Sequence, residues 1–110
     1  MKILLIDNRS KNVLNFRITI IEYLISLGHE VKIIFEGASV KLVSKFEDEN
    51  NPLYRKAKEA DLIAGVCMAC SKILGVYEAN LKTGLRMLDD MSGHAGMKKY
   101  IQDGYHVISM

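Results

Sequence analysis

The chain has 110 residues, of which 49% are hydrophobic and 25% charged, which is the size and composition of one globular domain over residues 1–110. Fifteen Lys and Arg side chains against thirteen Asp and Glu leave a net charge of +2, which argues against a nucleic-acid partner. The sequence has no apolar run of the roughly 20 residues that a membrane span needs, and no signal-peptide core of about 7 to 15 apolar residues. We therefore expect a cytoplasmic protein with no membrane partner.

Short apolar runs alternate with helical segments along the chain. The first run, Lys2 to Ile6, has no polar alternation, which is typical of a strand buried on both faces. Periodic apolar positions then predict a long helix from Lys11 to Leu27, which ends at Gly28. The other predicted strands are Glu30–Phe35, Asp61–Val66, Gly84–Leu88 and Tyr105–Met110. The other predicted helices are Val40–Phe46, Pro52–Ala60, Ala69–Gly75, Tyr77–Lys82 and His94–Gln102.

The predicted helix Lys11–Leu27 is apolar around an unusually wide arc. Its apolar positions span roughly 200°, against the roughly 100° stripe of an ordinary surface helix. Two explanations are open: neighbouring helices of the same chain cover the excess, or a second subunit does. The prediction of a homo-oligomer rests on the second explanation.

Five strands separated by helical connections predict an α/β fold, namely a three-layer α/β/α sandwich with a five-stranded, mainly parallel sheet. In such sheets, ligands and reactive groups collect beyond the carboxyl ends of the strands. The candidate positions at that edge are Asp7–Ser10, Glu36–Ser39, Cys67–Cys70 and Asp89–Gly96.

Cys67 is the most informative of these positions. It ends a predicted buried strand where a helix begins, so its thiol faces the N–H groups and the positive end of the helix dipole, which stabilise a thiolate. Cys70 lies about one helical turn further on and is either a resolving thiol or part of the packing. His94, at a predicted helix start, is a candidate to support the thiolate or to shuttle a proton, or else is an exposed histidine without a role.

The Cys-x-x-Cys pair allows two other interpretations. Thioredoxin-type exchange also needs a proline that faces the pair from a downstream position, and the single proline, Pro52, lies upstream. A zinc site needs four ligands, or three and a water; Cys67 and Cys70 supply two, and His94 is a candidate third. We expect no cofactor and no metal within one chain, while a zinc site shared between subunits stays open.

The segment Asp61-Leu-Ile-Ala-Gly-Val-Cys67-Met-Ala-Cys70-Ser-Lys-Ile-Leu-Gly75-Val resembles the signature of the DsrE/DsrF-like family of sulfur-relay proteins. In that family an apolar strand delivers a cysteine, and a short helix runs to a glycine eight residues later. The turn Phe35-Glu36-Gly37-Ala38-Ser39-Val40 and the last strand resemble the family as well, so the likeness covers nearly the whole chain. The resemblance implies a flavodoxin-like sandwich assembled as trimers or hexamers.

The resemblance also implies a role for Cys67. By position, this cysteine would accept sulfane sulfur as a persulfide and pass it on, whereas the resemblance assigns no role to Cys70 or His94. The leading hypothesis is therefore a small sulfur carrier, or sulfurtransferase-like protein, with sulfur donor and acceptor proteins as partners. The alternatives are a non-catalytic oligomeric module that binds a small ligand at the strand ends, and a thiol–disulfide redox or metal-binding protein that uses Cys67 and Cys70.

Overall fold

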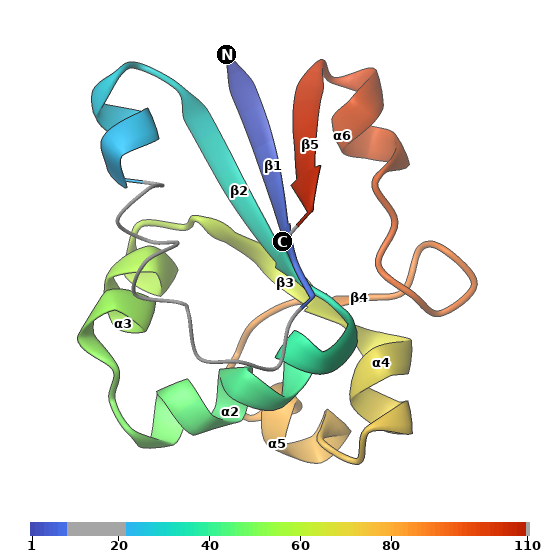
Figure 1. The fold of residues 1–110 in the computed structure, drawn as a ribbon. Helices are drawn as coiled ribbons and strands as arrows, with labels where there is room; N and C mark the ends of the chain where they lie inside the picture. Colours follow the sequence, from blue (N-terminus) through green and yellow to red (C-terminus); the bar gives the residue numbers. More distant parts are fainter. Residues whose placement is uncertain (9–21, 110) are drawn as a thin grey trace.

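The structure is a computed structural model that describes residues 1–8 and 22–109. These residues contain a five-stranded sheet in the order β4-β3-β2-β1-β5, in which all neighbouring strands are parallel (Figure 1). The predicted α/β class with a mainly parallel sheet is confirmed. The strands are β1 (Lys2–Asp7), β2 (Glu30–Phe35), β3 (Ile63–Cys67), β4 (Met87–Leu88) and β5 (Tyr105–Ser109).

Helices fill the connections between these strands (Figure 1). Residues 22–26 are helical, as predicted, but residues 11–21 of the predicted helix Lys11–Leu27 lie outside the described residues. Most of the apolar arc behind the homo-oligomer prediction lies there too, so that prediction stays open. The other helical elements are the 3-10 helix η1 (Gly37–Ser39), α2 (Val40–Asp48), α3 (Pro52–Glu59), α4 (Met68–Ile73), α5 (Tyr77–Leu81) and α6 (Lys98–Gln102).

The central strand β1 explains why the domain is layered. Its residues Ile3, Leu4, Leu5 and Ile6 are all buried. Because successive side chains of a strand point to opposite faces, unbroken burial means that both faces of β1 are covered. This arrangement is consistent with the predicted three-layer sandwich.

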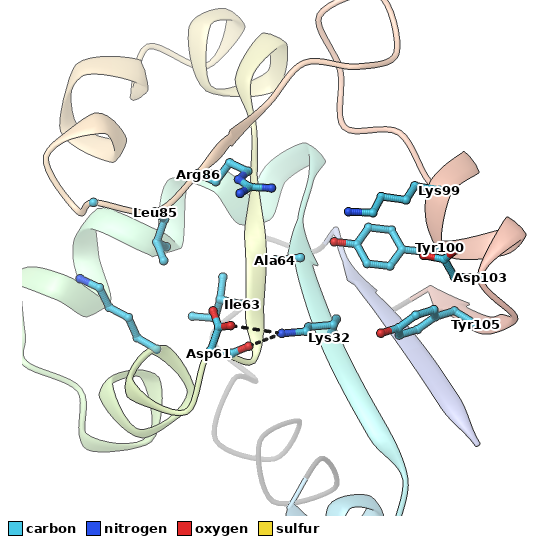
Figure 2. Close-up of a pocket in the computed structure, with 12 residues that line it drawn as sticks. Lys32, Asp61, Ile63, Ala64, Leu85, Arg86, Lys99, Tyr100, Asp103 and Tyr105 are labelled. Atoms are coloured by element: carbon cyan, nitrogen blue, oxygen red, sulfur yellow. Dashed lines mark hydrogen bonds and ion pairs between the residues drawn. The ribbon is translucent and has the colours of Figure 1, made fainter.

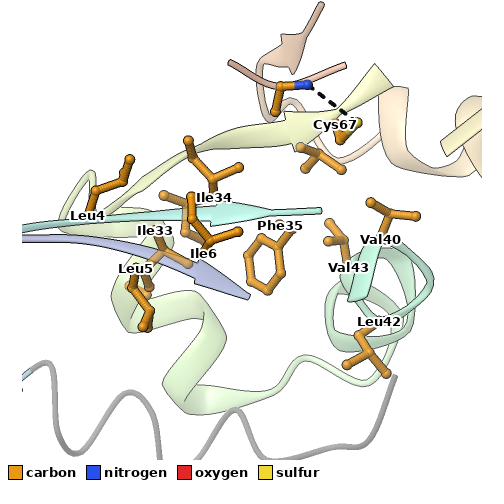
Figure 3. Packing of buried hydrophobic residues seen from close by; sticks show 14 of the residues in the cluster. Leu4, Leu5, Ile6, Ile33, Ile34, Phe35, Val40, Leu42, Val43 and Cys67 are labelled. Carbon is orange, nitrogen blue, oxygen red and sulfur yellow. Dashed lines mark hydrogen bonds between the residues drawn. The ribbon is translucent and has the colours of Figure 1, made fainter. Parts of the chain in front are cut away.

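The aromatic part of the core joins the sheet to the helices that follow β2. Phe35, at the end of β2, is fully buried and faces Val43 of α2 (Figure 3). Phe46 of α2 lies beside Tyr54 of α3, with 5.9 Å between their ring centroids. Burying a side chain of this size stabilises the fold by roughly 1.5–3 kcal/mol. Helix α3 is held in place at its start by Asn51, whose side chain accepts the Tyr54 N–H at 3.0 Å.

The strand predicted over Gly84–Leu88 is shorter than expected. Only Met87 and Leu88 pair with β3, opposite Val66 and Cys67. Before them, the Thr83 hydroxyl accepts the Leu85 N–H at 3.2 Å and keeps this segment in a turn. β4 therefore reaches β3 only beside its last two residues, where Cys67 lies.

The helix predicted from His94 to Gln102 begins later, at Lys98. Met91 and His94 exchange two backbone hydrogen bonds of 2.9 Å, which close a turn instead. After it, the Gly96 N–H donates to the Asp90 carboxylate at 3.0 Å. His94 thus lies in a loop rather than at a helix start, and the expectation about its local structure was wrong.

Candidate functional site

The carboxyl edge of the sheet gathers the predicted candidate segments in one place, apart from Arg9 and Ser10, which lie outside the described residues. The 3-10 helix η1 is tied to β1, because Glu36 N–H donates to the Asp7 carbonyl at 2.8 Å and the Ser39 hydroxyl donates to the same carbonyl. Asp7 and Ser39 are both buried. These polar groups hold the loop after β2 against the end of β1, and the Cys70 thiol forms a hydrogen bond with the backbone of Gly37 in that loop. The reactive side chains lie at and near the end of β3.

Cys67 is the last residue of β3 and the N-cap of α4. Its Sγ accepts the Cys70 N–H at 3.5 Å, as an N-cap side chain does, and the Ala95 N–H at 3.4 Å. Both donors are neutral backbone groups that stabilise negative charge on a sulfur. Figure 3 shows Cys67 at the end of its strand, above the apolar cluster. The side chain is 0% exposed, so the predicted strand-end position is combined with complete burial.

Three reactive groups converge at this point. The two cysteine Sγ atoms are 3.0 Å apart. The His94 Nδ1 atom lies 3.5 Å from the Sγ of Cys67 and 3.6 Å from that of Cys70. Cys67 is buried, Cys70 is half-buried and His94 is exposed, so the cluster runs from the core to the surface. The structure thus brings together all three predicted site residues, although nothing in it tests their roles.

A loop–helix contact places His94 over the thiols. The Ala69 N–H of α4 donates to the Gly93 carbonyl at 2.8 Å, which fixes the tip of the loop against the start of the helix. Gly93 has a φ of 89°, a left-handed conformation that glycine adopts without steric cost. The Ser92-Gly93-His94 segment therefore reaches the thiols by a turn, not by a helix terminus.

The environment of Cys70 keeps its thiol protonated. Burial, and then the hydrogen bond with the Cys67 thiol, raise the pKa of Cys70 from 9.0 to about 11. The nearby Glu36 carboxylate acts in the same direction, against a backbone hydrogen bond at Gly37. Cys70 is therefore a neutral thiol near pH 7. The Cys67 thiol donates to the Cys70 sulfur at 3.0 Å. The Cys67 sulfur in turn accepts the backbone N–H groups of Cys70 and Ala95.

A buried polar chain beneath the cluster escaped the sequence analysis. The Ser71 hydroxyl donates to the Cys67 carbonyl at 2.8 Å, and the Asn80 side-chain amide donates to the Ser71 Oγ at 3.1 Å and to the Val40 carbonyl at 3.0 Å. Ser71 and Asn80 are fully buried. This chain fixes α4, α5 and α2 relative to the end of β3. The sequence does not single these residues out, because each of the two short helices holds another polar residue, Lys72 in α4 and Glu78 in α5.

A hollow lies elsewhere, on one face of the sheet (Figure 2). It has a volume of about 670 Å³ and contains none of the three cluster residues. Lys32 of β2 crosses its floor and donates to the Asp61 carbonyl at 2.6 Å. From α6, Lys99 and Tyr100 project toward it (Figure 2). We call this hollow the sheet groove; no sequence pattern predicted it.

His29 and His106 lie at the other end of the sheet. His29 immediately precedes β2, and His106 pairs with Ile3 near the start of β1. Neither takes part in the cluster. Among the described residues, no helix has the length and apolar character required to cross a membrane.

Comparison with known proteins gives one family. The family model of the DsrE/DsrF-like family matches residues 1–110. An uncharacterized protein of Methanocaldococcus jannaschii is 38% identical over 86 residues, which are 76% of this chain and 68% of that protein. No solved structure matches the chain.

Proposed function

Because the chain belongs to the DsrE/DsrF-like family, we propose that it carries sulfane sulfur as a persulfide on Cys67. Family membership supports a sulfur-relay kind of function, and the assignment to Cys67 is our own step. The observation that carries it is the setting of the Cys67 sulfur, which accepts hydrogen bonds from two backbone N–H groups at the end of β3.

The transfer step needs no external oxidant. The Cys67 thiolate attacks the outer sulfur of a donor persulfide, the donor S–S bond breaks, and the donor sulfur leaves as a thiolate. Cys67 then holds an S–S group whose outer sulfur carries the negative charge. The N–H groups of Cys70 and Ala95, at 3.5 and 3.4 Å from Sγ, stabilise the thiolate that begins this step.

Loading requires a movement at the surface of the site, because Cys67 is 0% exposed. His94 and Cys70 are the two members of the cluster that solvent reaches. The loop that carries His94 is fixed to α4 by the bond between Ala69 and Gly93. Opening of this loop exposes the thiol to a donor, and its closure shields the persulfide from other thiols.

The 3.0 Å separation of the two sulfurs favours a second function, that of a dithiol couple. The Cys70 thiolate, once formed, attacks Sγ of the Cys67 persulfide, and a disulfide forms as hydrosulfide leaves. This step needs no external oxidant, because the outer sulfur of the persulfide is reduced to hydrosulfide as the disulfide forms. The raised pKa of Cys70 slows this step at neutral pH and keeps the sulfur on Cys67 until an acceptor arrives.

Further parts of the proposal concern partners and place. Sulfur donor and acceptor proteins and assembly as a trimer or hexamer follow from the family, and a cytoplasmic location follows from the sequence pattern; all of these stay predictions. The alternative of a non-catalytic module binding a small ligand at the strand ends also stays open. The sheet groove does not favour it, because the groove lies over the sheet face rather than at the site of the three clustered residues.

Intact-mass measurement tests the proposal. The reduced chain, treated with a metal chelator, is incubated with glutathione persulfide and its mass is recorded under non-reducing conditions. We expect a gain of one sulfur atom in the wild-type chain and in Cys70→Ser, and no gain in Cys67→Ser. Because a sulfur acceptor with two cysteines can lose its load by disulfide formation, Cys70→Ser is the matched control. Equal uptake by Cys67→Ser and the wild type would contradict the proposal.

A further inference from the structure

The cluster has the ligand chemistry of a metal centre. We propose that Cys67, Cys70 and His94 together bind one Zn²⁺ ion, with one ligand atom from each residue and a fourth coordination position left to a molecule from outside the chain. The three ligand atoms all lie within 4.8 Å of one another. The sequence had offered His94 as a third zinc ligand, but it could not place this side chain over both sulfurs.

The distances between the ligand atoms fit tetrahedral zinc. With Zn–S bonds of about 2.3 Å and Zn–N bonds of about 2.0 Å, a thiolate and an imidazole ligand are about 3.5 Å apart and two thiolates about 3.8 Å apart. His94 Nδ1 lies 3.5 and 3.6 Å from the two sulfurs. The sulfurs are 3.0 Å apart and must separate by about 0.8 Å to reach the zinc geometry. Cys70, which is half-buried, is the side chain that has room to turn.

The charge balance favours a divalent ion here. Two thiolates and one neutral imidazole carry a charge of −2, which a Zn²⁺ ion cancels. An unpaired thiolate at the fully buried Cys67 would be costly, whereas a Zn²⁺ ion bound by two thiolates and a neutral imidazole has no net charge. The N–H groups of Cys70 and Ala95 that point at the Cys67 sulfur are the kind of outer donors that surround metal-bound thiolates.

The ligand types select the metal. Two thiolates and an imidazole suit zinc and other thiophilic ions, whereas Mg²⁺ and Ca²⁺ prefer oxygen ligands. Three protein ligands with an open fourth position are the pattern of an exchangeable or catalytic zinc site rather than of a closed structural one. The exposed His94 leaves the open position on the solvent side of the cluster.

Zinc and sulfur then compete for the same atoms. This consequence rests on the proposed function: zinc on Cys67 occupies the lone pairs that attack a donor persulfide, so the zinc-loaded chain does not accept sulfur.

Zinc titration of the reduced full chain against a chromophoric chelator tests the site. We expect one Zn²⁺ per chain, no competition from Mg²⁺, and affinity weakened by at least about 100-fold in Cys67→Ser, Cys70→Ser and His94→Gln. Even outer-shell changes at zinc sites cost roughly 10- to 100-fold, and these variants remove ligands themselves. The matched control is His106→Gln, since His106 is exposed on β5 and far from the cluster in the sheet register, and it should bind zinc as the wild type does.

A spectroscopic measurement guards against variants that merely unfold. Co²⁺ bound to the wild-type chain should give the absorption of a tetrahedral ion and a thiolate charge-transfer band. Absence of both, or equal zinc affinity in His94→Gln and His106→Gln, would overturn the proposal. Sulfur uptake is recorded separately on chelator-treated chain. Zinc binding without sulfur uptake would support the metal site and contradict the sulfur-carrier function. Sulfur uptake without zinc binding would contradict the metal site and support the sulfur-carrier function.

Discussion

The cysteine cluster and the sheet groove differ in what they offer a ligand. The groove has a volume of about 670 Å³, but its Lys32 is already paired, with the Asp61 carbonyl at 2.6 Å and the Asp61 carboxylate at 3.6 Å. In the cluster, the ligand atoms of Cys67, Cys70 and His94 lie within 4.8 Å of one another. Converging reactive atoms, not volume, therefore mark the candidate site in this molecule.

The two regions are also supported differently. Beneath the cluster lies the buried hydrogen-bonded chain of Ser71 and Asn80, which reaches α2 and the Cys67 carbonyl. The groove is bordered by ion pairs that solvent reaches, such as Lys32 with the 93%-exposed Asp61 side chain. Buried hydrogen bonds fix geometry and are costly to break, whereas exposed ion pairs contribute little.

Asn80→Ala should have the largest effect on stability. The substitution leaves the buried Val40 carbonyl and Ser71 hydroxyl without the Asn80 amide, so we expect the free energy of unfolding to fall by about 2–4 kcal/mol. The groove counterpart, Lys32→Met, removes an ion pair and should change it by less than about 1 kcal/mol. Urea denaturation of both variants gives the comparison. Equal losses of unfolding free energy in the two variants would mean that the buried hydrogen bonds beneath the cluster stabilise the fold no more than the exposed ion pair does.

Gly65→Ala tests the strand that the two regions share. A Cβ at Gly65 would lie 2.6 Å from the Arg86 carbonyl and 2.7 Å from Leu88 Cγ, so β4 must move away from β3. We expect a loss of about 1–3 kcal/mol, typical of overpacking. The matched variant is Gly84→Ala, where a Cβ meets nothing within 4 Å and the φ of 79° alone costs about 1 kcal/mol. A smaller loss at Gly65 than at Gly84, by urea denaturation, would contradict the packing.

The Cys70 thiol makes the stability of the cluster depend on pH. Burial and the Cys67 thiol raise the pKa of Cys70 to about 11 from 9.0, so between these values the folded chain holds a proton that the unfolded chain has lost. Stability should be complete below about pH 9 and fall as the pH rises toward 11. Thermal unfolding of the wild type and Cys70→Ala at pH 8 and pH 10.5 measures this. We expect the unfolding temperature to decrease less from pH 8 to pH 10.5 in Cys70→Ala than in the wild type, because the tyrosines contribute equally in both chains. Equal decreases would refute the assignment of this pH dependence to Cys70.

The smallest expected effect comes from the rim of the groove. Arg86→Ala and Lys99→Ala remove two cations that line the groove and touch neither cysteine. Sulfur uptake and zinc affinity should stay within about twofold of the wild type, because exposed charges at this distance are screened by salt. A tenfold decrease in either would mean that the groove and the cluster act as one site.

Local sequence patterns predicted the parts of the fold that depend on neighbouring residues. The apolar run Lys2–Ile6 and the capped start at Pro52 specify a strand and a helix without reference to the rest of the chain. The strand end at Cys67 was placed correctly for the same reason, within one residue. Sequence reasoning therefore found the three candidate side chains, although the local structure it gave His94 was wrong.

Contacts between distant residues were not predictable in this way. The loop that carries His94 is shaped by the bond between Gly96 and Asp90 and by the bond from Ala69 to Gly93, neither of which leaves a periodic pattern. The complete burial of Cys67 and the bonds of Asn80 likewise depend on how helices meet. Such features require the assembled fold.

The most direct test of the central claim is to locate the sulfur within the chain. After loading with glutathione persulfide and alkylation, trypsin releases residues 59–72, between Lys58 and Lys72, as one peptide that contains both cysteines. Fragmentation of this peptide assigns the added sulfur to one of them. The account predicts that it resides on Cys67 in the wild type and in Cys70→Ser. Added sulfur on Cys70 alone, or on neither cysteine, would contradict it.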